Sequence, residues 1–167
     1  ILHLPPPIHG AAMMGKYIQE SELVNSSFDC FCINLATAGS LSDIGHISLK
    51  KLLKYFFLLK HISHVVREIR PELVYITPNA GGKAFFKDFI VVQMLKSMGC
   101  KVIAHYHNKG VSVYQSKWVY NFFYKRFFSN LKVILLAENL YKDIAKYVKR
   151  EDVYICPNGI PNLRKGE

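Results

Sequence analysis

The sequence predicts an α/β fold, a doubly wound, Rossmann-like parallel sheet of about six strands with helices on both faces. Short apolar runs alternate with longer stretches of 3.6-residue hydrophobic repeat along the chain. The stretches between the runs are long enough for the helical crossovers that parallel strands require. Half of the 167 residues are apolar, which is enough to build the core of one domain.

The first half of the chain contains three predicted strands and two predicted helices. Three prolines follow the first strand, and Gly10 opens the first helix. Pro71 ends the longest helix, because the residue before a proline avoids the helical region. In chain order we expect a strand over 1–4, a helix over 10–24, a strand over 28–35, a helix over 48–70 and a strand over 73–77.

The second half continues the alternation with three more strands. Gly99 ends a predicted helix, and Pro157-Asn158-Gly159 closes the pattern with turn residues. In order we expect a helix over 83–98, a strand over 101–106, a helix over 115–129, a strand over 132–137, a helix over 138–148 and a strand over 153–156. Residues 1–156 are therefore predicted to be one domain, and 157–167 the start of an interdomain linker.

Charge and cysteine usage restrict the partners. The net charge of +10 favours anionic partners: nucleotide diphosphates, anionic lipid or nucleic acid. Basic residues are spread over several elements without a known RNA- or DNA-binding signature, so we expect no nucleic acid. The four cysteines form no CxxC pair, so we expect free thiols in a reducing compartment and no metal. No apolar run reaches the roughly 18 residues of a membrane span, and we expect a cytoplasmic domain.

Four segments combine turn residues with the ends of predicted strands. A proline-rich loop follows the first strand, and His107-Asn108 follows a later strand. The segments are Leu4 to Ala12, Lys101 to Gly110, Lys132 to Tyr141, and Ile155 to Pro161. In this order they resemble motifs of the family 4 glycosyltransferases, which have the two-domain GT-B fold. Ala137 stands where that family commonly has a serine.

This resemblance implies the amino-terminal, acceptor-side domain of a retaining glycosyltransferase. Such an enzyme moves a sugar from a nucleotide-sugar donor to a carbohydrate or lipid-linked acceptor and needs no metal or other cofactor. The family's second domain carries a Glu-x7-Glu element and most donor contacts, and these residues contain neither. The resemblance therefore implies that this domain alone is inactive without its C-terminal domain.

The candidate site residues come from loops at the carboxyl ends of the strands, where parallel sheets bind ligands. Gly10 and Ala11 open a helix after a strand, so its free amides can bind a phosphate. The resemblance implies that His107 contacts the donor sugar or its diphosphate, and we treat it as the catalytic candidate. His105, inside the strand, is predicted to be a buried structural histidine. We assign acceptor binding to His9, Asn79, Lys83 and Asn108.

The long helix over 48–70 offers a membrane contact. One line of apolar side chains, from Leu49 to Ile69, is predicted to be its core face. Lys50 and Lys54 lie on the other side with Phe57, and a basic face with a protruding aromatic can bind an anionic membrane surface. This would place the domain on the inner face of the membrane. The aromatic helix near residues 117–128 is predicted to be sandwiched between other elements.

Two other functions fit the same sequence. Sugar-nucleotide epimerases of the GT-B kind have the same first-domain layout, and a non-enzymatic basic α/β binding module needs no active site. The sequence does not specify the donor sugar, the acceptor, the linkage or the oligomeric state.

Overall fold

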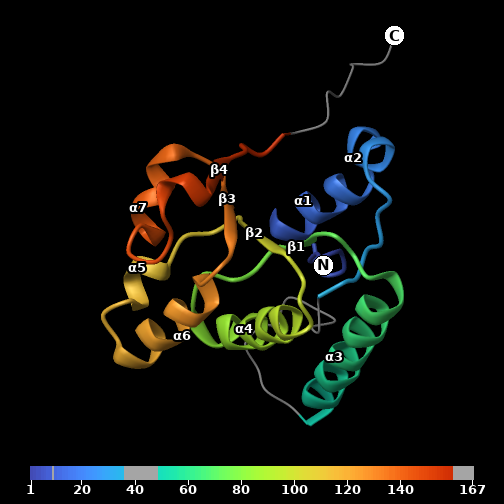
Figure 1. The fold of residues 1–167 in the computed structure, drawn as a ribbon, viewed down its shortest axis with the longest axis horizontal. Helices are drawn as coiled ribbons and strands as arrows, with labels where there is room; N and C mark the ends of the chain where they lie inside the picture. The colour runs from blue at the N-terminus through green and yellow to red at the C-terminus, as the bar shows by residue number, and fades with distance from the viewer. Residues whose placement is uncertain (9, 36–48, 160–167) are drawn as a thin grey trace.

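A four-stranded parallel sheet forms the centre of the computed structural model, which describes residues 1–8, 10–35 and 49–159 (Figure 1). The spatial order is β1-β2-β3-β4. Val102 of β2 pairs with Val74 of β1, and Val133 of β3 pairs with Ala104 of β2 and Val153 of β4. The α/β class and the parallel sheet are thus confirmed. The strands are β1 (Val74–Ile76), β2 (Val102–Tyr106), β3 (Lys132–Leu135) and β4 (Val153–Ile155).

The prediction of six strands is wrong for the part of the chain that the structure describes. The first two expected strands are reduced to one parallel bridge between Leu2 and Asn34. Ile1 joins this bridge to β1, because its backbone nitrogen donates a hydrogen bond to the Tyr75 carbonyl at 2.7 Å. Residues 28–33 form no ladder, although their apolar residues suggested a strand. The segment 28–35 lies at the edge of the sheet and has a neighbour on one side only. Few of its backbone groups are hydrogen-bonded to that neighbour, the segment around Leu2.

A doubly wound sheet of the dinucleotide-binding kind would carry the six expected strands in the spatial order 3-2-1-4-5-6, and the structure does not have this order. That order would place the segment 1–4 beside 101–106. Instead, Ile1 is hydrogen-bonded to β1, and β1 pairs with β2. β1 therefore lies between the segment 1–4 and the segment 101–106. Strand adjacency therefore does not bring Gly10 next to His107, as that order had predicted.

Helices surround the sheet, and two of the expected ones are each divided into two. Ser21 begins a new helix within 10–24, because its hydroxyl accepts a hydrogen bond from the Val24 N–H at 3.3 Å. The expected helix over 138–148 starts with a 3₁₀ turn, Glu138–Leu140, and another turn, Arg150–Asp152, precedes β4. The α-helices are α1 (Gly10–Gln19), α2 (Glu22–Ser27), α3 (Leu49–Ile69), α4 (Gly82–Ser97), α5 (Val111–Tyr114), α6 (Trp118–Phe128) and α7 (Tyr141–Ile144).

Aromatic rings join α4 to α6 in the core. Phe85 of α4 is fully buried, and its ring centroid lies 4.6 Å from that of Tyr124 and 5.5 Å from that of Phe127. The Tyr124 hydroxyl donates to the carbonyl of Ala80 at 2.6 Å. The cluster therefore also holds the loop that follows β1. The expected sandwiching of the aromatic helix is confirmed only in part, because Trp118 and Phe122 are 79% and 48% exposed.

The predicted core face of α3 is wrong in the first half of that helix. Leu49 and Phe56 are 74% and 51% exposed, whereas Ile62 is fully buried. The face that packs on the domain is rotated from the predicted one and carries Tyr55, Leu58, Leu59, Ile62, Val65 and Val66. The reason is that this half of α3 is apolar on almost every side, so periodicity alone cannot select the buried face. No helix in the described ranges is both long and apolar enough to cross a bilayer.

Candidate functional site

Two histidines lie together at the carboxyl end of β2. Their ring centroids are 4.2 Å apart, and His105 lies in the strand while His107 follows it. The Tyr75 hydroxyl, from the neighbouring β1, lies 2.5 Å from Nδ1 of His105. Alternation along a strand places residues two apart on the same side, which explains why the two rings meet.

The surroundings of this pair favour uncharged rings. The pKa of His105 is lowered to about 4, first by burial and second by the nearby His107, whereas the backbone of Cys156 opposes the shift. Burial also lowers the pKa of His107, and the side chain of Asn158 opposes that shift. Both pKa values move in the direction that desolvation of an imidazolium requires. At neutral pH the site thus holds two neutral imidazoles, each able to donate one hydrogen bond and accept another.

Three ring nitrogens of the pair are buried without a hydrogen-bond partner. They are Nε2 of His105 and both nitrogens of His107. The Cys156 backbone comes close enough to affect the pKa of His105, and the Asn158 side chain that of His107, but neither completes a hydrogen bond of normal geometry. Buried polar atoms of this kind are uncommon, and binding a ligand is one established reason for them. The structural role expected for His105 therefore applies only to its Nδ1, which is close to the Tyr75 hydroxyl, and not to its Nε2.

The turn after β4 belongs to this site, although its sequence suggested only a linker. The Cys156 N–H donates to the Leu135 carbonyl at 2.8 Å, so the chain continues along β3 at the end of the sheet. Asn158 then lies beside His107. The Pro-Asn-Gly motif was the signal available in the sequence, but it did not indicate which strand the asparagine would reach.

The loop after β1 carries Asn79, whose amide groups are used inside the protein. Its backbone N–H and its Nδ2 donate to Oδ2 of Asp88 at 2.8 and 2.7 Å. Asp88 is fully buried, and burial raises the pKa of its carboxyl while the adjacent Lys87 lowers it. Asn79 therefore retains its side-chain oxygen and the second hydrogen of Nδ2 for an acceptor substrate. Lys83, in the first turn of α4, is exposed.

Asn108 connects the loops that follow β1 and β2. Its Oδ1 accepts a hydrogen bond from the Ala80 N–H at 3.2 Å. The next turn of this loop is anchored by Asp143, which accepts from the backbone N–H groups of Gly110, Val111 and Ser112 at 2.9 to 3.0 Å. Although burial raises the pKa of Asp143, hydrogen bonds led by that of the Ser112 hydroxyl lower it overall. These amides are thus occupied by a carboxylate from α7.

The start of α1 differs from the start of α5, because no carboxylate is found in its first turn. Gly10 is exposed, no atom lies within 4 Å of the position that a Cβ would occupy, and the first turn contains no acidic residue. Ala11 is partly exposed beside it. A glycine that we had not singled out, Gly15, packs so closely that a Cβ there would collide with the His3 carbonyl. His9 and residues 36–48 lie outside the described residues.

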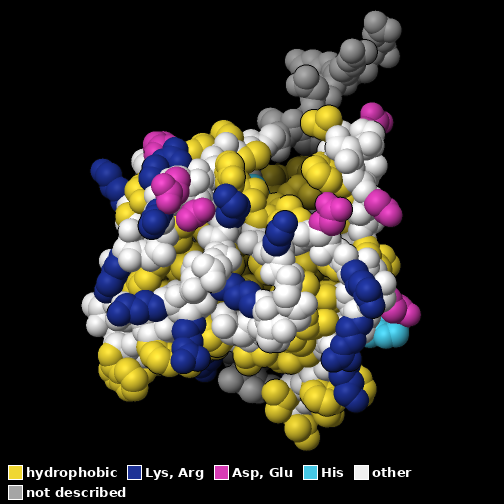
Figure 2. All heavy atoms as spheres, in the orientation of Figure 1, with side chains coloured by type: hydrophobic (Ala, Val, Ile, Leu, Met, Phe, Trp, Pro, Cys, Tyr) yellow, Lys and Arg dark blue, Asp and Glu magenta, His cyan; other side chains and the backbone are white. Residues whose placement is uncertain are grey.

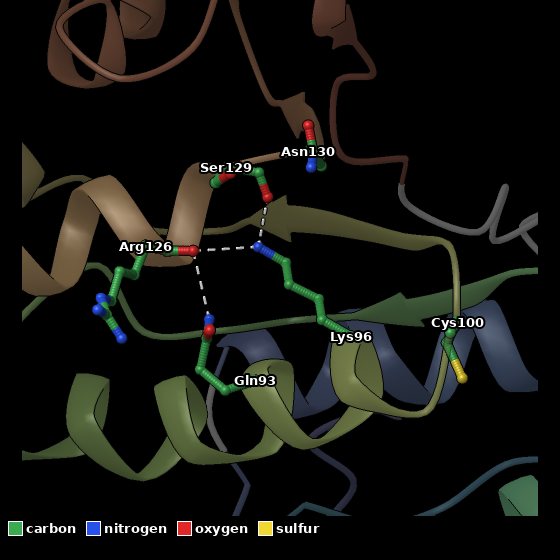
Figure 3. A pocket seen from close by; sticks show the side chains of 7 residues that line it. Gln93, Lys96, Cys100, Arg126, Ser129 and Asn130 are labelled. Atoms are coloured by element: carbon green, nitrogen blue, oxygen red, sulfur yellow. Dashed lines mark hydrogen bonds between the residues drawn. The ribbon is translucent and has the colours of Figure 1, made fainter.

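The measured pockets lie at the opposite end of the sheet. One of about 370 Å³ is bordered by the end of α4 and the end of α6 (Figure 3). Its Lys96 ammonium donates to the carbonyls of Arg126, Phe127 and Ser129 at 3.2, 2.7 and 2.5 Å, and burial lowers the pKa of Lys96 to about 8. Lys96 therefore caps the carboxyl end of α6, which is a structural role. A pocket of about 670 Å³ beside Arg70 and Pro71 also lies before the strands begin.

The carboxyl end of the sheet is hollowed on its surface. Figure 2 shows this hollow between α1 and the region of β3 and β4, with apolar side chains on its floor. Within the described ranges no group of three or more histidine, cysteine or acidic residues is placed to hold a metal ion. The neutral imidazoles at this end can donate hydrogen bonds to a ligand and accept them.

We expect the burial of His105 to appear as a pH dependence of stability. A histidine whose pKa falls from 6.5 to about 4 on folding stabilises the protein fully above pH 6.5, and this contribution is lost as pH falls toward 4. With an allowance for solvent screening, the loss should be about 2 kcal/mol. Urea unfolding at pH 7 and pH 4.5 measures it, and His105→Asn should remove that part of the dependence. An equal dependence in both proteins would contradict the assignment.

Comparison of the chain with protein-family models, curated proteins and solved structures finds no match. Its function is therefore inferred from the side chains at the carboxyl end of its sheet.

Proposed function

We propose that the chain is the acceptor-side domain of a retaining GT-B glycosyltransferase, acting in polysaccharide biosynthesis. In this proposal the sheet belongs to a doubly wound domain, and a second domain completes the donor site. The reaction transfers a sugar from a nucleotide-sugar to a carbohydrate or lipid-linked acceptor. We place this reaction in the cytoplasm, at the inner face of the membrane.

The observation that carries the proposal is the neutral His105–His107 pair with unpaired ring nitrogens at the carboxyl end of β2. When a glycosidic bond to a diphosphate breaks, negative charge grows on the leaving oxygen. A neutral imidazole N–H can donate a hydrogen bond to that oxygen or to a sugar hydroxyl. Because the ring is already held and desolvated, its orientation costs little during the reaction.

The start of α1 supports the same proposal. Gly10 and Ala11 open a ten-residue helix, and the positive end of such a helix stabilises a phosphate. The net charge of +10 further favours a nucleotide diphosphate. In contrast, Asp143 already fills the amino end of α5, so a phosphate would not bind there.

The acceptor is proposed to bind beside this donor position. Asn108 and the side-chain oxygen of Asn79 lie in the two loops joined at Ala80, and Lys83 is exposed on the adjoining helix. His9 precedes α1 and remains an acceptor candidate. These groups offer hydrogen bonds suited to sugar hydroxyls.

A product assay on the whole gene product tests the proposal. The protein is incubated with a panel of nucleotide-sugars, with and without lipid-linked and oligosaccharide acceptors. We expect release of nucleoside diphosphate and a glycosylated product only when an acceptor is present, and no turnover by residues 1–167 alone. Conversion of the sugar-nucleotide without any acceptor would show an epimerase instead. If the whole gene product neither binds nor turns over any of the donors, the proposal is wrong.

A further inference from the structure

The amino-terminal half of α3 presents a large apolar surface to solvent. Five side chains form it, and we call them the α3 surface. Their exposed fractions are 74% for Leu49, 60% for Leu52, 52% for Leu53, 51% for Phe56 and 64% for Phe57. The opposite side of the same helix is packed on the domain through Ile62 and through the Tyr55 hydroxyl, which donates to the Lys87 carbonyl at 2.6 Å. The exposed side is therefore not needed to hold the helix in place.

A second apolar projection lies at the start of α6. Trp118 is 79% exposed and Phe122 is 48% exposed. Phe123, in contrast, packs on Phe89 of α4, with the two ring centroids 4.8 Å apart. Figure 1 shows α3 and α6 on either side of α4. In Figure 2 apolar side chains project at the lower edge of the molecule below both helices. The two projections thus share one edge.

Cations accompany both projections. The Lys60 ammonium lies 4.9 Å from the centroid of the Phe56 ring, and the Arg126 guanidinium 4.8 Å from that of Phe122. Lys50 and Lys54 are exposed on α3. The chain has no Asp or Glu from 44 to 67 or from 89 to 137, and the second stretch contains seven Lys or Arg. In Figure 2 the acidic side chains lie away from the lower edge.

We propose that this edge, consisting of the α3 surface with Trp118 and Phe122, binds the surface of an anionic lipid bilayer. Apolar side chains bordered by Lys and Arg match the acyl boundary and the negative headgroups in one arrangement. The long basic side chains can keep their charges at headgroup level while their stems lie on the apolar surface. Leucines and phenylalanines have no such role in binding a phosphate backbone, which favours lipid over nucleic acid.

The docking edge includes more of α3 than the part expected from the sequence. Lys50, Lys54 and Phe57 remain in it. The leucines and Phe56, which we had assigned to the core, now supply most of its apolar area. Docking does not depend on the proposed glycosyl transfer, because the two hydrophobic projections and the His105–His107 pair are separate features.

Trp118 provides a direct readout, since it is the one tryptophan of the chain. Its fluorescence is measured with vesicles of phosphatidylcholine alone and of phosphatidylcholine mixed with phosphatidylglycerol. We expect a blue shift and protection from acrylamide only with the mixed vesicles, reversed as salt screens the charges. No blue shift, or equal shifts with both kinds of vesicle, would overturn the proposal.

A pair of matched variants locates the contact. Phe56→Ser with Phe57→Ser should weaken binding to the mixed vesicles by roughly tenfold or more. Phe28→Ser with Phe31→Ser serves as the control, because these rings are 66% and 57% exposed but belong to the segment between α2 and the Leu2–Asn34 bridge. Circular dichroism checks that both variants fold.

If the edge binds another kind of partner, the experiments will give different results. If the edge joins two copies of this chain, sedimentation will show a dimer that only Phe56→Ser with Phe57→Ser dissociates, with no vesicle binding. If it binds nucleic acid, duplex DNA will shift on a gel and the two serine variants will bind it equally. Either result, or equal loss of vesicle binding in both serine variants, would overturn the proposal.

Discussion

Replacing His107 by alanine should slow glycosyl transfer by the whole gene product by about tenfold to a thousandfold, the usual cost of losing one hydrogen-bond donor to developing charge. Both ring nitrogens of His107 are buried without a hydrogen bond of normal geometry among the described residues, and Asn158 beside them is exposed and can bind water. The fold should therefore survive. Initial rates at saturating donor and acceptor measure the effect.

The division between kcat and KM separates a catalytic role from a binding role. Loss in kcat at constant KM would indicate a contact made only in the transition state, whereas a rise in KM alone would indicate ordinary ligand binding. His61→Ala is a suitable control, because His61 is exposed on α3. An unchanged rate in His107→Ala would contradict the assignment of this residue.

Phe85→Ala should lower the free energy of unfolding by about 3 to 5 kcal/mol, because it opens a cavity in the aromatic cluster between α4 and α6. Phe85 is fully buried, with the ring of Tyr124 at 4.6 Å. Urea unfolding measures the change. As a control, Phe122→Ala should change the free energy of unfolding by less than about 1 kcal/mol, because Phe122 is 48% exposed. Equal effects in the two variants would contradict this description of the core.

The aromatic cluster also supports the candidate site. Tyr124 donates to the carbonyl of Ala80, whose N–H donates to Asn108 beside His107. Loosening the packing around Tyr124 should therefore disturb the loops at the carboxyl ends of β1 and β2. The rate of the proposed glycosyl transfer in a Phe85 variant that remains folded would test this link between the aromatic cluster and the two loops.

Local signals in the sequence determined which kind of element forms at most positions. Pro71 ends α3 after Ile69, and Gly99, with a φ of +80°, follows the end of α4. Both effects depend on backbone sterics within one or two residues, which a sequence contains directly. The run from 101 to 106 forms β2 because a short apolar segment between such breaks can be buried on both faces. The position of His107 just after a strand could be predicted in the same way.

Only the tertiary structure decided which elements are neighbours. β1 lies between the first segment and β2, and α3 buries Ile62 rather than Leu49. Asn158 comes to His107 from 51 residues further along the chain, and Tyr75 comes to His105 from β1. These contacts depend on the choice among several apolar faces and strand orders with similar local patterns. That choice is made by the total area buried and by backbone hydrogen bonds between distant segments, and no short stretch of sequence contains either.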